Sequence, residues 1–211
     1  MVFEEFYSSP GPGGQKAGSN LKPERIRTTE LIAEYYPSAD LRIVGNLFRY
    51  AVRDLIEAGV DPVDGLQVFG NSGSARTTGA GLEIERRWPS GARLRASYSL
   101  QRAADRMGAW LVNSPRNLFK GNAVLPLGAG WVAGAELRYT SKRRTLAGEI
   151  PGYAIGNLNV TLPAAIPGLE LSASLYNIFD KRYADPGGPE HAQDSIRQDG
   201  RTFLARLRHR F

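Results

Sequence analysis

The sequence has 211 residues, a net charge of +6 and no cysteine, which excludes disulfide bridges and thiolate metal sites. No apolar stretch approaches the roughly 18 residues that a membrane helix needs, so a helical membrane protein is excluded as well. A transmembrane β-strand needs only about 9 to 11 residues of alternating character. Residues 1–14 lack the basic and apolar regions of a signal peptide, so we do not expect a complete secretory precursor.

About nine strands are predicted from the alternation of apolar and polar residues, because successive side chains of a strand point to opposite faces. The last strand shows the pattern well: Phe203, Ala205 and Leu207 fall on one face, and Arg206 and Arg208 fall on the other. The face that is apolar is ambiguous in residues 41–52. In chain order the predicted strands are residues 29–36, 41–52, 66–88 with a glycine-rich interruption, 92–102, 116–125, 131–139, 153–162, 169–179 and 201–211.

The connections alternate between short turns and long polar loops. The turns are residues 37–40, 89–91, 127–130 and 163–168, and the loops are residues 56–65, 103–114, 141–152 and 180–200. This alternation is typical of an outer-membrane barrel, with tight periplasmic turns and long external loops. The predicted fold class is therefore all-β, an antiparallel transmembrane β-barrel. A soluble β-sandwich is the alternative, but faces rich in alanine fill a sandwich core poorly.

Several short motifs occur in the order found in TonB-dependent outer-membrane receptors, and the chain resembles that family over essentially its whole length. Their order is more specific than any one motif. They are Leu21-Lys22-Pro23-Glu24 before Glu30-Leu31, Asn71 before Gly81-Leu82-Glu83, Ser114-Pro115-Arg116, the segment Leu175-Tyr176-Asn177-Ile178-Phe179-Asp180-Lys181-Arg182-Tyr183, and the ending Gly200-Arg201 with Phe211.

The resemblance implies the C-terminal part of a receptor barrel in the bacterial outer membrane, with residues 1–25 as an external loop remnant and 26–211 as barrel strands. The family's plug domain, its TonB-contacting box and more than half of its strands have no counterpart in the sequence. The implied partners are outer-membrane lipid, the missing plug and strands, the TonB complex through the plug alone, and a small-molecule nutrient such as a ferric siderophore or cobalamin. An independent small barrel with a pore or adhesin role is the alternative.

No catalytic, cofactor-binding or metal-binding residue is predicted. Acidic residues and His191 between residues 183 and 200 are interpreted as a solvated loop, because spacing within a long loop fixes no metal geometry. Nucleic acid is not an expected partner, since the arginines lack interleaved aromatic residues on their own face. Structural roles are expected for the family-motif residues Leu21, Lys22, Pro23, Glu24, Asn177, Phe179, Asp180, Tyr183, Gly200, Arg201 and Phe211. Lumen-facing positions are expected for Arg93, Arg95, Arg138, Arg206, Arg208 and Arg210.

Overall fold

The computed structural model describes residues 8–9, 14–18, 20–163 and 168–209. These residues form strands, turns and loops, and they include no helix long and apolar enough to cross a membrane. The predicted all-β antiparallel class is confirmed. Arg210 and Phe211 lie outside the described residues, so the positions predicted for them stay predictions.

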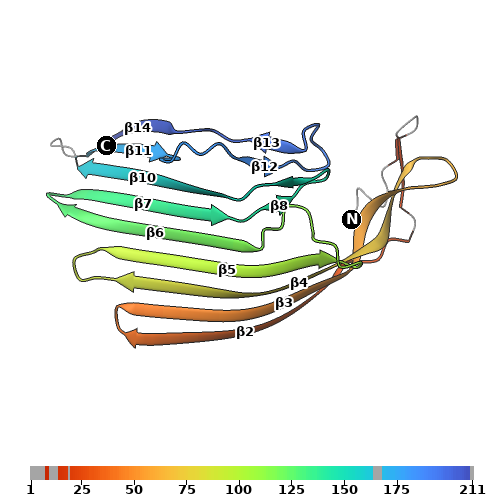
Figure 1. Ribbon diagram of the computed structural model, residues 1–211, viewed down its shortest axis with the longest axis horizontal. Coiled ribbons are helices and arrows are strands. Elements are labelled where there is room, and N and C mark those ends of the chain that lie inside the picture. The colour runs from red at the N-terminus through yellow and green to blue at the C-terminus, as the bar shows by residue number, and fades with distance from the viewer. Residues whose placement is uncertain (1–7, 10–13, 19, 164–167, 210–211) are drawn as a thin grey trace. The chain divides into compact units, whose positions relative to one another are not determined.

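Nine long strands follow one another in a single sheet, in the order β14-β11-β10-β7-β6-β5-β4-β3-β2 (Figure 1). They are β2 (Arg25–Ser38), β3 (Leu41–Val60), β4 (Gln67–Arg87), β5 (Arg93–Asp105), β6 (Asn117–Gly128), β7 (Trp131–Thr140), β10 (Tyr153–Pro163), β11 (Leu169–Tyr176) and β14 (Thr202–His209). The short strand β1 (Gln15–Lys16) pairs in parallel with β4. Two small hairpins join β8 (Arg143–Arg144) to β9 (Glu149–Ile150) and β12 (Ala184–Pro186) to β13 (Ser195–Arg197).

The strands and connections differ from the predicted ones in several places: β2 begins at Arg25 rather than residue 29, β5 continues to Asp105, and β11 ends at Tyr176 rather than residue 179. The strand predicted to end at residue 52 continues to Val60, although Asp54 has a positive φ of 57°. The glycine-rich interruption expected in β4 is absent, because β4 is hydrogen-bonded to β3 and β5 on either side. At least one of its glycines leaves room for the side chain of a neighbouring strand. A Cβ on Gly81 would lie 2.2 Å from Asn46 Oδ1. The loops predicted at residues 141–152 and 180–200 contain the two hairpins.

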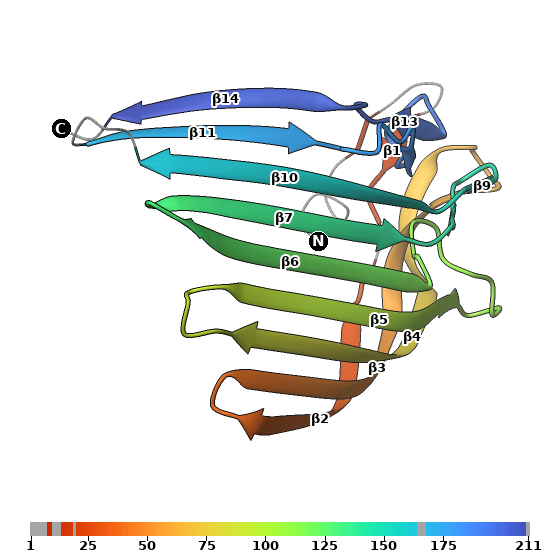
Figure 2. The ribbon, with the colours of Figure 1, turned by 60° about the vertical axis from the view of Figure 1, so that its left-hand side comes forward.

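The chain divides into two compact units. The first comprises residues 1–30, 48–78 and 103–111, and the second comprises residues 31–47, 79–102 and 112–211. The second unit contains part of each of the nine long strands, and Figure 2 shows β5 to β14 side by side in it.

Register in the second unit aligns apolar residues across strand after strand. Residues directly opposite each other in a ladder share a face. One row of paired apolar residues crosses six strands. The face of the sheet that carries this row is called the apolar face. The row runs Leu94, Ala123, Ala135, Leu158, Leu175 and Phe203.

The opposite surface, called the polar face, carries the charged residues. Ser97, Lys120 and Arg138 form one row across β5, β6 and β7, and Glu170 is paired with Arg208 across β11 and β14. On the apolar face Phe203 is 67% exposed and Leu207 is 66% exposed. Burying such a side chain is worth about 1.5 to 3 kcal/mol, so a wide exposed row of them requires an apolar environment.

We predict that the apolar face contacts lipid. The protein has no native cysteine, so single cysteines report accessibility directly. In assembled outer membranes, Leu207→Cys should resist a membrane-impermeant maleimide after the outer membrane is opened, whereas Arg206→Cys should react. Labelling of both sites, or of residue 207 alone, would contradict the assignment of the two faces.

Candidate functional site: the polar face of the sheet

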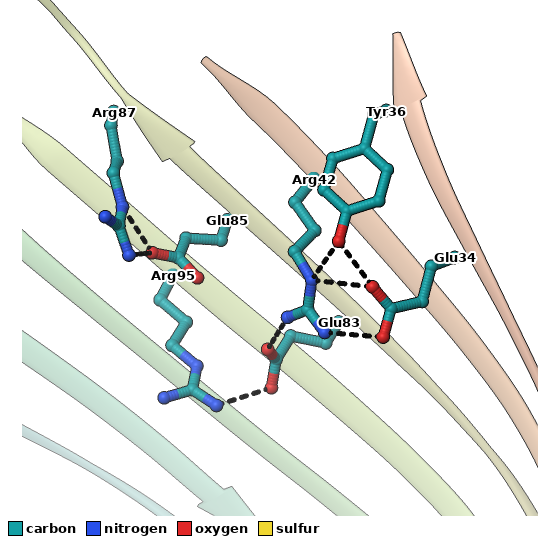
Figure 3. A network of polar contacts seen from close by, with 7 residues as sticks. All are labelled: Glu34, Tyr36, Arg42, Glu83, Glu85, Arg87 and Arg95. Carbon is teal, nitrogen blue, oxygen red and sulfur yellow. Dashed lines mark hydrogen bonds and ion pairs between the residues drawn. The ribbon is translucent and has the colours of Figure 1, made fainter. Parts of the chain in front are cut away.

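Four charged residues of alternating sign cross four adjacent strands of the second unit, and together they are called the charge ladder (Figure 3). They are Glu34 on β2, Arg42 on β3, Glu83 on β4 and Arg95 on β5. Arg42 Nη2 lies 2.9 Å from Glu34 Oε1, and its Nη1 lies 3.4 Å from Glu83 Oε1. Arg95 Nη2 lies 2.8 Å from Glu83 Oε2. The ladder therefore links four strands through one shared carboxylate.

The two arginines of the charge ladder differ in the number of carboxylates that they contact. Arg42 contacts two carboxylates, and the Tyr36 hydroxyl lies 3.3 Å from its Nε. Among the residues that the structure describes, Arg95 has one ion-pair partner, Glu83, and its side chain is 63% exposed. Within the described residues, Lys120 makes no hydrogen bond or ion pair. Positive charge therefore increases from β3 toward β6.

A polar hollow of about 520 Å³ lies beside the charge ladder within the second unit. Its lining includes Arg42, Asn46, Glu83, Arg95 and Lys120, together with apolar side chains from neighbouring strands. No group of three or more histidine, aspartate or glutamate residues in the described chain is arranged to hold a metal ion. The polar side chains of the hollow include three cations, the Glu83 carboxylate, the Asn46 amide and the hydroxyls of Ser97 and Ser99, beside apolar side chains. Their net charge is positive, which suits an anionic or hydrogen-bonding ligand.

The other described arginines that were predicted to face the lumen lie on β5, β7 and β14. Arg138 lies over the ring of Tyr153, 5.8 Å from its centroid. Arg208 Nη1 lies 3.6 Å from Glu170 Oε1. Arg206 and Arg93 also lie on the polar face. Arg206 is opposite Ser172 in the ladder of β11 and β14, and Arg93 is opposite Val124 in the ladder of β5 and β6. That these arginines face a lumen stays a prediction.

A buried arginine that the sequence did not single out ties together loops of the second unit. The Arg143 side chain is 8% exposed, and its Nη2 donates to Asp185 Oδ1 at 2.6 Å and to the Ala184 carbonyl at 3.2 Å. Its Nη1 donates to Asn113 Oδ1 at 3.1 Å, and the guanidinium lies 5.6 Å from the Tyr153 ring centroid. Arg143 thus joins residues 141–152 to the segment at Ala184 and Asp185, while residues 189–193 of the later loop are exposed.

The motif Leu21-Lys22-Pro23-Glu24 is held by hydrogen bonds within the first unit. Asn71 Oδ1 accepts from the Lys22 amide at 2.7 Å, and Asn71 Nδ2 donates to the Lys22 carbonyl at 2.8 Å. Asn71 Nδ2 also lies 2.6 Å from the Asp54 carbonyl, and Glu24 Oε1 accepts from the Ile56 amide at 2.9 Å. Two motifs far apart in sequence therefore contact each other directly. Leu21 and Pro23 lie in the same segment, next to these contacts.

The second motif closes the ends of β11 and β14. Asn177 is buried with a φ of 48°, and its Nδ2 donates to the carbonyls of Lys181 at 2.9 Å and Asp199 at 3.2 Å. Asp180 Oδ1 accepts from the Arg201 amide at 2.9 Å. A Cβ on Gly200 would lie 2.8 Å from Asp180 Oδ1, which explains the glycine.

The remaining residues of that motif are aromatic. Phe179 is 57% exposed, and a Cβ on Gly156 would lie 3.1 Å from its ring. Gly156 is opposite Leu137 in the ladder, which places Phe179 beside the apolar face. The Tyr183 ring is 4.3 Å from that of Tyr153. Burial raises the pKa of the Tyr183 hydroxyl above its ordinary value.

We predict a pH-dependent contact between two loops. The pKa of the Asp194 carboxyl is held below its ordinary value of 3.8, first by the Thr145 hydroxyl and next by the Ala147 amide. A carboxyl with a lowered pKa in the folded state stabilises above its unfolded pKa, and that stability is lost as the pH falls through the folded pKa. Deuterium uptake by residues 145–150, corrected for intrinsic rates, should rise as the pH falls below 3.8. Asp194→Asn should remove this pH dependence, and an unchanged profile in the variant would contradict the assignment.

The fold and the two-faced sheet define a segment of outer-membrane barrel wall, and comparison with known proteins identifies the family. The sequence profile of the family described as "TonB dependent receptor-like, beta-barrel" matches residues 2–178. The chain belongs to this family, whose members are β-barrels of the bacterial outer membrane. A comparison with curated protein sequences found no match.

Solved structures of the same architecture confirm the fold. The ferric-catecholate import receptor Fiu from Escherichia coli K12 has a TM-score of 0.74 and 19% identity, over 98% of this chain and 30% of that one. The FrpB iron transporter from Neisseria meningitidis has a TM-score of 0.75 and 16% identity, over 94% and 33%. The copper transporter OprC has a TM-score of 0.74 and 20% identity, over 100% and 35%. The chain spans about a third of the length of these proteins.

Proposed function

We propose that this chain forms part of the barrel wall of a TonB-dependent receptor that imports a scarce nutrient, such as a ferric siderophore or cobalamin. The observation that carries the proposal is the two-faced sheet of the second unit. One face repeats apolar residues across six strands, and the other carries the charge ladder and the polar hollow. A wall with lipid on one side and a polar interior on the other has this distribution of side chains.

The solved relatives support a metal-bearing cargo but differ in its identity. Fiu imports ferric catecholates, FrpB is an iron transporter, OprC is a copper transporter, and FecA is a ferric citrate transporter that covers 88% of this chain at 19% identity. Because one barrel architecture serves these different cargoes, the polar side chains and the loops decide which is taken. The family and these relatives are receptors and transporters rather than enzymes.

We assign the cationic part of the polar face an electrostatic role. Arg95 and Lys120 are exposed beside the hollow, and Arg138 lies in the same row as Lys120. Cations that line a wet interior attract an anionic cargo or pair with acidic residues of a plug domain. The same reasoning extends to Arg93, Arg206 and Arg208 on the polar face.

Uptake in cells tests this proposal. A strain that lacks the whole receptor of which this chain forms part should take up radiolabelled ferric siderophores or cobalamin poorly under nutrient limitation, and restoring the whole receptor should recover uptake. Recovery should disappear in a strain without TonB. Recovery that is independent of TonB, with passive ion conductance in planar bilayers, would favour the alternative of a small pore-forming barrel.

A further inference from the structure

Two cations lie directly opposite each other on neighbouring strands of the second unit, and together they are called the cation pair. Lys120 on β6 is opposite Arg138 on β7 in the ladder, and Ser97 on β5 is opposite Lys120 from the other side. Opposite residues of an antiparallel ladder share a face and have Cβ atoms about 4.5 to 5.5 Å apart. The Lys120 ammonium and the Arg138 guanidinium therefore belong to one small site on the polar face.

The cation pair has no bound counter-charge among the described residues. Lys120 is exposed and makes no hydrogen bond or ion pair there. Arg138 Nη2 donates to the Tyr153 hydroxyl at 3.5 Å, and the Arg138 Nε is buried without a partner. Like charges directly opposite each other destabilise a sheet, and a buried donor without a partner costs free energy. An anion held between the two side chains would remove both penalties.

Two carboxylates lie near the cation pair, but other groups bind them. Asp185 Oδ1 accepts from Arg143 Nη2 at 2.6 Å. Glu136 lies two residues from Arg138 on the same face, and its Oε2 accepts from Asn157 Nδ2 at 3.0 Å. Neither carboxylate forms an ion pair with the cation pair within the part of the chain that the structure describes. Even with Glu136 counted, the site keeps a net positive charge.

The cation pair is accessible from the polar hollow. Lys120, Ser97 and Ser99 line this hollow, whose volume is about 520 Å³, and Arg138 follows on the next strand. Pockets for small ligands measure roughly 300 to 1,000 Å³. The hollow can therefore hold a small chelate that places one anionic group on the cation pair.

The site lies toward the end of β7 that leads into a long loop. Arg138 is two residues from the end of this strand at Thr140, and the loop of residues 141–152 follows. The tight turn at residues 129–130 lies at the other end of β7. If short turns are periplasmic, the cation pair lies toward the external mouth of the barrel. This position fits a ligand that arrives from outside the cell.

The surroundings of the cation pair favour a carboxylate over an aromatic chelating group. Tyr153, the aromatic residue beside Arg138, is 5% exposed, and the Tyr183 ring lies 4.3 Å from its ring. Its faces are thus closed to stacking on a ligand. The accessible groups are an ammonium, a guanidinium and serine hydroxyls. A guanidinium binds a carboxylate through two parallel hydrogen bonds, and hydroxyl groups donate to the remaining oxygens.

We propose that the cation pair binds a carboxylate group of the imported nutrient, so that the receptor selects an anionic ferric polycarboxylate over neutral ferric chelates and cobalamin. The inference rests on the proposed function and names the class of its substrate. Lys120 and Arg138 are then the residues that determine specificity for charge. Ser97 hydrogen-bonds the ligand beside them.

Equilibrium binding to the whole assembled receptor tests the site with ferric citrate, a neutral ferric trihydroxamate and cobalamin. Ferric citrate should bind most tightly. Lys120→Gln with Arg138→Gln should weaken its binding about a hundredfold, at roughly tenfold for each charged hydrogen-bond donor that is lost. Lys120→Arg with Arg138→Lys keeps the charge and should retain most of the affinity.

The control is Lys181→Gln with Arg197→Gln, which removes one lysine and one arginine from exposed positions outside the site and should leave binding unchanged. Equal weakening by both pairs would overturn the site. If the cation pair instead holds a carboxylate of the plug, Lys120→Gln with Arg138→Gln should lower the thermal midpoint of the ligand-free receptor and spare ferric citrate binding, which would also overturn the inference. If that double variant does not assemble, Lys120→Gln alone tests the same site, because Lys120 is exposed.

Uptake of the same three probes in cells separates this inference from the proposed function. TonB-dependent uptake of ferric citrate that is lost in the glutamine variants would support both. TonB-dependent uptake of the neutral chelate or cobalamin alone, equal in the parent and in the variants, would overturn the inference and leave the proposed function standing. Uptake of none of the three would count against the proposed function itself.

Discussion

Replacing Asn177 by alanine should destabilise the assembled barrel by about 3 kcal/mol, because buried backbone groups would lose their partners. The Asn177 side chain donates to the carbonyls of Lys181 and Asp199 and accepts from the Lys181 amide at 3.0 Å. Asn177 is 4% exposed, so water does not readily replace these bonds. Its φ of 48° adds a backbone penalty for alanine, which tolerates that conformation less well than asparagine.

Unfolding in guanidinium chloride, followed by tryptophan fluorescence, measures the loss. Asn177→Gly separates the two causes, since glycine relieves the backbone penalty but restores no hydrogen bond. Asn122→Ala is the matched control, because Asn122 is an exposed asparagine in the middle of β6 and should cost little. Equal losses for Asn177→Ala and Asn122→Ala would show that the motif does not close the strand ends in the way described.

The fold was largely predictable because its main signal is local. Alternation in a strand needs only neighbouring residues, so Phe203, Ala205 and Leu207 were separated from Arg206 and Arg208 without any tertiary information. Where that signal failed, pairing with neighbours decided the structure. β4 continues through its glycines because β3 and β5 flank it and because Asn46 occupies the space beside Gly81.

The candidate site was less predictable, because its contacts join residues far apart in the chain. Arg42 is the centre of the charge ladder, but it lies in residues 41–52, where the apolar face was ambiguous. Its partners Glu34 and Glu83 share a face with it only in the folded sheet. The role of Arg143 is unpredictable for a similar reason, since nothing near it in sequence indicates burial against Asp185 and Tyr153.

The open edges of the sheet should have a large energetic cost in a membrane. Within the described residues of the second unit, the sheet ends at β14 on one side and at β2 on the other, and no ladder joins them. In an edge strand every second residue directs both its N–H and its C=O outward, so the 8 residues of β14 expose about eight backbone groups. Each unsatisfied group costs several kcal/mol in hydrocarbon, so an open edge costs on the order of 20 kcal/mol or more.

Strand direction determines which partner can close these edges. The strands alternate in direction along the sheet, and both β2 and β14 point to the same side in Figure 1. Joining them directly would therefore give a parallel pair. A second copy related by a twofold axis along the membrane normal would also present strands of the same direction, so it gives parallel pairs as well. Antiparallel closure requires a segment with an odd number of strands whose outer two run the opposite way.

We therefore predict that the 211-residue chain, targeted to the outer membrane by an added leader, forms no closed barrel alone or with a second copy. It should show no heat-modifiable band in gel electrophoresis, and added protease should degrade it. Co-expression with a segment of an odd number of β-strands from a related receptor barrel should restore both properties, because it pairs antiparallel with both edges. A segment with one strand fewer leaves one edge facing a strand of its own direction and should fail. A heat-modifiable, protease-resistant monomer of the chain alone would show that β2 and β14 do pair, and would establish the small-barrel alternative instead.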